Sequence, residues 1–166
     1  MTRPAPDPAA TAPDPAPAPV PAAAARQALL RTLALAEADE VLATLGAIDP
    51  APDYTVVRGP EVGLVMVRGR IGGGGAPFNA GEATVARCTV KLASGEVGFG
   101  HVMGRDEMRA KAIALLDALA QTAAHAETIA AAARAMDAAR TAREAARAAE
   151  VAATRVDFFT MVRGED

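Results

Sequence analysis

Hydrophobic positions in the first third of the chain follow a helical period. Asp39 is placed to cap the second of two short helices, and Pro50 follows its end. Two groups of apolar side chains recur at three- and four-residue spacing: Leu29, Leu30 and Leu33, then Val41, Leu42, Leu45 and Ile48. The pattern therefore predicts two short helices between residues 26 and 48.

The middle of the chain changes to strand patterns. Tyr54–Val57 reads as a short strand, and Val62–Ile71 is apolar on both faces at its centre, which predicts a central strand of a sheet. Glu82–Leu92 alternates between small or apolar residues and polar ones. Ser94-Gly95 predicts a hairpin turn, after which Glu96–Met103 returns as the next strand.

Helical spacing resumes after the strands. The turn at residues 104–106 opens a helix whose apolar stripe is predicted to be Met108, Ala112, Leu115 and Leu119. Residues 123–153 are an alanine-rich helix with Ile129 and Met136 on its buried face, and residues 154–166 read as a closing strand or docking arm. The order predicts an α+β fold with N-terminal helices, a small mainly antiparallel sheet, long alanine-rich C-terminal helices and the closing segment.

Composition divides the chain into a tail and one domain. Residues 1–24 alternate proline and alanine with few large side chains, a composition that cannot bury enough surface to offset its ordering entropy. We expect a disordered tail there and a single folded domain over residues 25–166. No aromatic-rich core is available, because the 166 residues include no tryptophan, one tyrosine and four phenylalanines.

Charge and cysteine content narrow the function classes. A formal net charge of -3 disfavours a nucleic-acid-binding protein, which usually carries a clustered basic excess. No apolar run is long enough to predict a membrane span, so a cytoplasmic location is expected. The lone cysteine, Cys88, excludes a cysteine-based metal site, and we expect no metal or cofactor to be held by this chain alone.

One loop combines glycines with an anchoring aromatic. Four successive glycines, Gly72, Gly73, Gly74 and Gly75, precede Pro77, Phe78 and Asn79. They do not form a phosphate-binding loop, because no GK[ST] follows, the GxGxxG spacing fails and a strand rather than a helix comes next. A loop shaped for a protein partner and a simple connection remain, and the first is favoured.

Arginines lie at or near strand ends around this loop: Arg58, Arg68, Arg70, Arg87 and Arg105. Together they would bind a phosphate or the carboxylates of a partner, and a partner is favoured; a solvated strand edge is the alternative. Glu82 joins the candidates at the start of the following strand. His101 shares a strand face with Phe99 and Met103, which favours an interface or core histidine over a catalytic one. No residue is predicted to be catalytic.

Longer stretches resemble a known family. The segments are RGPEVGLVMVRGRIGGGGAPFNAGEATVARCTVKL, GEVGFGHVMGRD and the terminal TRVDFFTMVRGE. In this order they closely resemble the PhnG family of bacterial phosphonate utilisation, over all of the chain except the Pro/Ala tail.

The resemblance implies a subunit of the carbon–phosphorus lyase core complex, alongside PhnH-like, PhnI-like and PhnJ-like subunits. With PhnH, PhnI and the ATPase-like PhnL, such proteins support transfer of an alkylphosphonate onto the ribose of ATP, which releases adenine and gives a ribose 1-phosphonate 5-triphosphate. The nucleosidase chemistry is attributed to PhnI and the radical cleavage to PhnJ. ATP and phosphonate would thus be substrates of the complex, and the glycine-rich loop is expected to contact the PhnI-like subunit.

Two function classes remain open at this point. In the first, the chain is a non-catalytic subunit of that transferase complex. In the second, it is a small stand-alone enzyme that binds a nucleotide or phosphonate through the arginines and His101. Co-purification with a PhnI-like protein, and inertness of the isolated chain, would distinguish the subunit from the enzyme.

Overall fold

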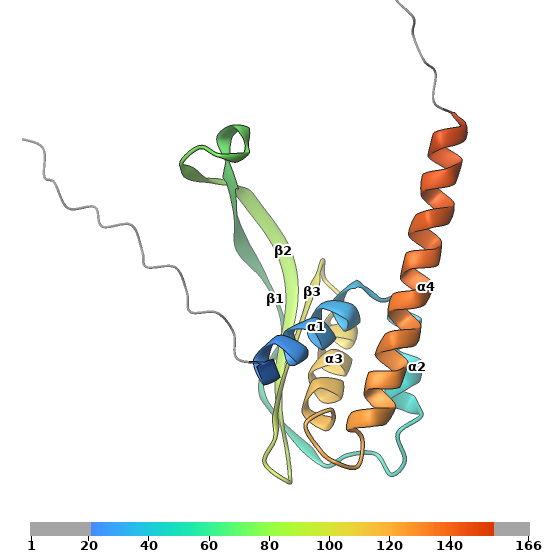
Figure 1. Ribbon diagram of the computed structural model, residues 1–166. Coiled ribbons are helices and arrows are strands. Elements are labelled where there is room, and N and C mark those ends of the chain that lie inside the picture. Colours follow the sequence, from blue (N-terminus) through green and yellow to red (C-terminus); the bar gives the residue numbers. More distant parts are fainter. Residues whose placement is uncertain (1–20, 155–166) are drawn as a thin grey trace, which may run out of the picture.

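A computed structural model describes residues 21–154, and the α+β class is confirmed (Figure 1). The closing segment predicted for residues 154–166 lies, from residue 155 onward, outside the described residues. The elements are α1 (Pro21–Leu35), α2 (Ala38–Gly46), β1 (Tyr54–Arg70), the 3-10 turn η1 (Ile71–Gly73), β2 (Pro77–Leu92), β3 (Val97–Met103), α3 (Glu107–Leu119) and α4 (Ala126–Ala153).

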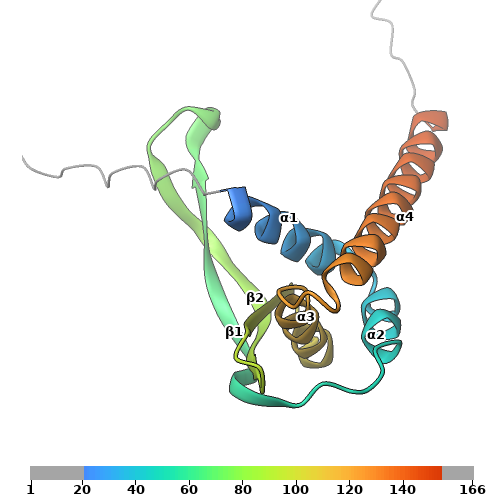
Figure 2. The same ribbon diagram turned by 60° about the horizontal axis from the view of Figure 1, so that its bottom comes forward.

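Helix α3 is the centre of the hydrophobic core. Asp106 caps its first turn by accepting the Arg109 backbone N–H at 2.9 Å, as the turn at residues 104–106 predicts. The helix is buried over most of its circumference, because the sheet covers one side and α1, α2 and α4 pack around the rest (Figure 2). The predicted single stripe is therefore too narrow, and its first member, Met108, is exposed.

Two glycines of β3 let its backbone lie directly against α3. A Cβ at Gly98 would come within 2.0 Å of the Ala114 carbonyl oxygen, and one at Gly100 within 1.9 Å of the Ala110 carbonyl oxygen. No side chain fits in this space, so strand and helix pack backbone to backbone. The helix offers alanines at the contact, which keeps the approach close.

The three strands form an antiparallel sheet in the order β1-β2-β3. The alternation predicted in β2 is confirmed, since Ala86, Cys88, Val90 and Leu92 are buried against the helices. Burial raises the pKa of the Cys88 thiol above its usual range, as desolvation disfavours the thiolate. The turn predicted at Ser94-Gly95 joins β2 to β3, and Gly95 has the positive φ that it requires.

The expectation of a central strand at residues 62–71 is wrong. These residues and the strand predicted at Tyr54–Val57 belong to one 17-residue strand, β1, which lies at the edge of the sheet. The central strand is β2. An apolar run on both faces is typical of a buried strand, but here much of the run extends past the body of the protein.

The N-terminal helices differ in detail from the prediction. Helix α1 begins at Pro21, so residues 21–24, expected in the tail, form its first turn. Asp39 lies inside the first turn of α2 and is not its cap. Glu37 occupies the cap position, where its backbone N–H donates to the Glu40 carboxylate at 3.0 Å. Glu40 in turn accepts a hydrogen bond from Arg143 of α4 at 2.9 Å.

Helix α4 confirms the alanine-rich prediction. Ile129, Ala133 and Met136 bury its first half, whereas its second half extends away from the body (Figure 1). Arg140 bridges Asp137 and Glu144 on this helix at 2.7 and 2.6 Å. Pairs of this kind at three- and four-residue spacing on an exposed helix face support the helix only weakly.

Candidate partner-binding arm

Beyond the end of β3, strands β1 and β2 continue alone as a two-stranded arm. The last residue pair between β2 and β3 is Val85–Met103, whereas β1 and β2 stay paired up to Arg70 and Pro77. We call residues 64–83, which include the loop that connects the two strands, the arm. Figures 1 and 2 show it rising from the body without a helix packed on it.

The arm exposes large apolar side chains on both of its faces. Leu64 and Met66 are 61% and 54% exposed on the face that continues the core side of the sheet. Val65 and Val67 are exposed on the opposite face, and Ile71 at the tip is 74% exposed. An isolated two-stranded hairpin is marginally stable in water, and contiguous exposed apolar surface of this kind marks an interaction site. This surface is the candidate interaction site that the described residues present.

The glycine-rich loop forms the tip of the arm. Gly72 has φ +60°, the left-handed region that favours glycine. A Cβ at Gly75 would come within 2.6 Å of the Ile71 carbonyl oxygen, which accepts the Gly75 N–H at 2.9 Å. At Gly74 there is open space. The backbone therefore requires glycine at Gly72 and Gly75 but not at Gly74, and Gly73 lies in the same tight turn.

Neighbouring candidates from the sequence also lie in the arm. Phe78 covers Gly69 across the two strands, since a Cβ there would lie 3.5 Å from the ring. Asn79 pairs with Arg68 and Glu82 with Met66 in the strand register, and both Asn79 and Glu82 are exposed. The aromatic ring fills the gap that the glycine leaves, which stiffens the arm below its tip.

The arginine candidates do not converge on one point. Arg58 and Arg87 both donate to Glu61, at 2.8 and 2.7 Å, at the root of the arm. These hydrogen bonds, the Arg87 bond first, lower the pKa of Glu61 below its usual range. Arg68 and Arg70 lie further out; Arg68 is seven positions after Glu61, which is roughly 23 Å along an extended strand. A single anion cannot contact both groups.

The remaining candidates, Arg70, Arg105 and His101, lie at the tip of the arm or near its base. Arg70 donates to the Gly75 carbonyl oxygen at 3.1 Å, which braces the tip loop. Arg105 is exposed in the turn after β3, whose Gly104 N–H bonds to Thr84 at the base of the arm. His101 pairs with Arg87 in the register and is exposed on the outer sheet face beside Phe99 and Met103. That open face fits the interface interpretation of His101 better than a core position.

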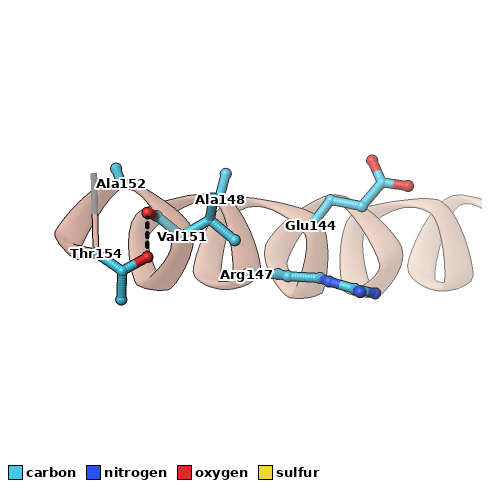
Figure 3. Close-up of a pocket in the computed structure, with 6 residues that line it drawn as sticks. All are labelled: Glu144, Arg147, Ala148, Val151, Ala152 and Thr154. Carbon is cyan, nitrogen blue, oxygen red and sulfur yellow. Dashed lines mark hydrogen bonds between the residues drawn. The ribbon is translucent and has the colours of Figure 1, made fainter. Parts of the chain in front are cut away.

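One surface hollow lies on α4, apart from the candidate residues. It follows the far half of α4 and is lined by that helix alone, through Glu144, Arg147, Ala148, Val151, Ala152 and Thr154 (Figure 3). Its one hydrogen bond among the side chains drawn joins Thr154 to the Val151 carbonyl oxygen at 2.9 Å. Within residues 21–154 no group of three or more histidine, cysteine or acidic residues is placed to hold a metal ion.

Sequence reasoning missed a polar cluster at the other edge of the sheet. Asp117 of α3 is fully buried and accepts two hydrogen bonds from Arg26 of α1, at 2.9 and 2.6 Å. The bond to Asp117 raises the pKa of Arg26. An aspartate inside the apolar run of residues 112–119 was the available signal, because a buried carboxylate requires a charged partner.

A family model described as phosphonate metabolism protein PhnG matches residues 24–164. The chain belongs to the PhnG family. The resemblance seen in the sequence is thereby confirmed, and it includes the whole arm.

A curated relative agrees with this assignment. The chain is 52% identical over 137 residues to a Rhizobium meliloti (strain 1021) protein named alpha-D-ribose 1-methylphosphonate 5-triphosphate synthase subunit PhnG. The match covers 82% of this chain and 88% of the relative. Between residues 21 and 154, none of the helices of this PhnG-family chain is long and apolar enough to cross a membrane.

Proposed function

We propose that this PhnG-family chain is an accessory subunit of an alpha-D-ribose 1-methylphosphonate 5-triphosphate synthase in phosphonate catabolism. The complex transfers an alkylphosphonate onto the ribose of ATP and releases adenine. The arm carries this proposal, because it presents apolar side chains on two faces that the described part of the chain leaves uncovered. A partner subunit would cover them. The name of the Rhizobium relative supports the same role.

Within that complex the PhnI-like subunit is our proposed partner for the arm, with PhnH-like and PhnJ-like subunits and a PhnL-like ATPase in the wider assembly. ATP and phosphonate are then substrates of the complex and this chain supplies no cofactor. The stand-alone enzyme is disfavoured, since Arg58 and Arg87 are committed to Glu61 and lie far from Arg68 and Arg70.

Reconstitution with the other subunits from the same bacterium tests this role. The isolated chain should release no adenine from ATP and methylphosphonate, while the full set of subunits should release it and should lose activity when this chain is omitted. Adenine release by the purified chain alone would contradict the subunit role and restore the enzyme alternative. Failure of the chain to co-purify with any of the subunits would contradict it as well.

A double variant connects the role to the arm. Val65→Thr with Val67→Thr keeps the shape of both side chains but makes them polar, so the chain should fold and yet be retained less by the tagged subunits. Val57→Thr is the matched control, because Val57 is also exposed on β1 but lies outside the arm. Equal retention of the double variant and the control would remove the arm from the interface.

A further inference from the structure

The two edge strands of the sheet, β1 and β3, differ in whether other parts of the chain bond to their outward backbone groups. At the β3 edge, the Val97 carbonyl oxygen accepts hydrogen bonds from Arg26 at 2.8 Å and from Gln121 at 2.9 Å. The Phe99 backbone N–H donates to Asp117 at 2.9 Å. Side chains of α1, of α3 and of the turn after α3 therefore bond to outward-facing backbone groups of this edge, so another strand cannot pair there.

The β1 edge has its backbone groups directed outward. The Gly104 N–H donates to the Thr84 carbonyl oxygen at 2.9 Å, so the Thr84 groups point toward β3 and away from β1. Leu64 lies opposite Thr84 in the register. In an antiparallel ladder the Leu64 N–H and C=O then point away from β2, and by alternation so do those of Val62 and Met66.

This outward edge lacks the usual protection. From Val62 to Val67 the strand has no charged residue and no proline; Pro60 precedes the stretch and Arg68 follows it. Natural proteins protect exposed edges with charges, prolines or covering elements, because an apolar open edge is a template for pairing with another chain. The sheet order β1-β2-β3 leaves this side of β1 unpaired within the described residues.

We propose that the β1 edge from Val62 to Val67 accepts a β-strand from another subunit of the synthase complex. That strand is apolar where it lies opposite Leu64 and Met66 and carries carboxylates where it lies opposite Arg68 and Arg70. The proposal rests on the proposed function and adds its binding mode: main-chain hydrogen bonds supply affinity, and the alternating side chains supply specificity. Cross-strand pairing of an arginine with a carboxylate favours this register.

A second copy of this chain fits the edge poorly. When two identical edges pair antiparallel about a two-fold axis, residues on the same face lie opposite each other, so even-numbered residues meet even-numbered ones. The only carboxylate of β1 is Glu61, which is odd-numbered and already bonded to Arg58 and Arg87. In a homodimer Arg68 would therefore meet an apolar residue or another arginine.

Two substitutions at Leu64 distinguish main-chain pairing at this edge from contact through the side chain. Leu64→Ala removes the side chain but keeps the backbone N–H, whereas Leu64→Pro removes both. Because that N–H does not bond to β2, proline is tolerated there as it is at other edges, and both variants should melt within about 2 °C of each other. Met66→Pro against Met66→Ala repeats the comparison at the next outward N–H. Val65→Pro is the contrast, since its N–H faces β2 and its loss should loosen the arm itself.

In co-purification with the tagged subunits of the complex, Leu64→Pro should be retained at least about tenfold less than Leu64→Ala, because each lost hydrogen bond leaves a partner carbonyl unpaired. Equal retention of the proline and alanine variants at both positions would overturn strand pairing, while the proposed function would stand if the wild-type chain still assembles. A dimer of the isolated chain in sedimentation that Leu64→Pro dissociates would also overturn it.

Charge substitutions at Arg68 test whether the partner strand carries carboxylates. Arg68→Glu should weaken retention more than Arg68→Gln, and the loss should shrink as salt is raised. Arg134→Glu is the matched control, because Arg134 is an exposed arginine of α4 away from the arm. Equal effects of Arg68→Glu and Arg68→Gln would overturn the acidic character of the partner strand.

Discussion

Helix α3 and the β1 half of the arm are both dense apolar segments, yet the helix is almost wholly buried and the strand segment is largely exposed. Residues 112–119 of α3 are covered on nearly all sides by the sheet and the other helices. The side chains of residues 64–67 stay 38–61% exposed within the described chain. The difference shows that hydrophobic sequence encodes burial, but not whether the same chain or another one supplies the cover.

The largest effect is expected where strand and helix backbones touch. Gly100→Ala places a methyl group within 1.9 Å of the Ala110 carbonyl oxygen, so β3 and α3 must separate. We expect a loss of about 3 kcal/mol in the free energy of unfolding, measured by urea denaturation. Gly81→Ala in the arm is the control, since a Cβ there meets no atom within 4 Å. A loss below about 1 kcal/mol for Gly100→Ala would show that the contact between β3 and α3 tolerates an added methyl group as the arm does.

A smaller loss is expected from the polar cluster that closes the β3 edge. Arg26→Ala leaves the buried Asp117 carboxylate with only the Phe99 N–H described above. The free energy of unfolding should fall by about 2 kcal/mol, because an unpaired buried acceptor keeps its desolvation cost. Arg134→Ala, which breaks an exposed pair with Glu127, should cost under about 0.5 kcal/mol. Similar losses for the two variants would mean that the cluster stabilises no more than a surface pair.

The same substitution in both regions sharpens the comparison. Val90→Thr buries a hydroxyl in the core and should cost about 1.5 kcal/mol of unfolding free energy. Val65→Thr in the arm should cost under about 0.5 kcal/mol, yet it should weaken assembly with the tagged subunits. Stability losses of equal size would mean that the arm is packed on something within this chain.

The smallest effect concerns pH at the root of the arm. The pKa of Glu61 is lowered in the folded chain, so its stabilising contribution is present above the carboxyl's unfolded pKa and is lost as pH falls through the lower, folded value. Glu61→Gln should therefore lower the urea midpoint at pH 7 and have less effect at pH 3. If the urea midpoints of wild type and variant differ by the same amount at pH 7 and pH 3, the Arg58 and Arg87 bonds to Glu61 do not stabilise the fold.

The sequence predicted the helices, the alternation of β2 and the β2–β3 turn, because each depends on local spacing. It misplaced β1, because a strand that is apolar on both faces is typical of the centre of a sheet. Only the strand pairing, in which β2 lies between β1 and β3, puts β1 at the edge. It named Gly72, Gly75 and Phe78 as parts of a binding loop, but grouped Arg58 and Arg87 with Arg68 and Arg70, whose separation depends on strand register. Arg26 and Asp117 are 91 residues apart, and no local pattern joins them.

Hydrogen exchange of the chain, alone and within the reconstituted complex, tests most directly whether the arm is the surface that a partner subunit covers. In the free chain the amides of β3 and α3 should exchange slowly and those of residues 62–71 quickly. On assembly, residues 62–71 should become protected, while β3 and α3 stay as they were. Protection that appears elsewhere and leaves residues 62–71 as exchangeable as in the free chain would contradict the account.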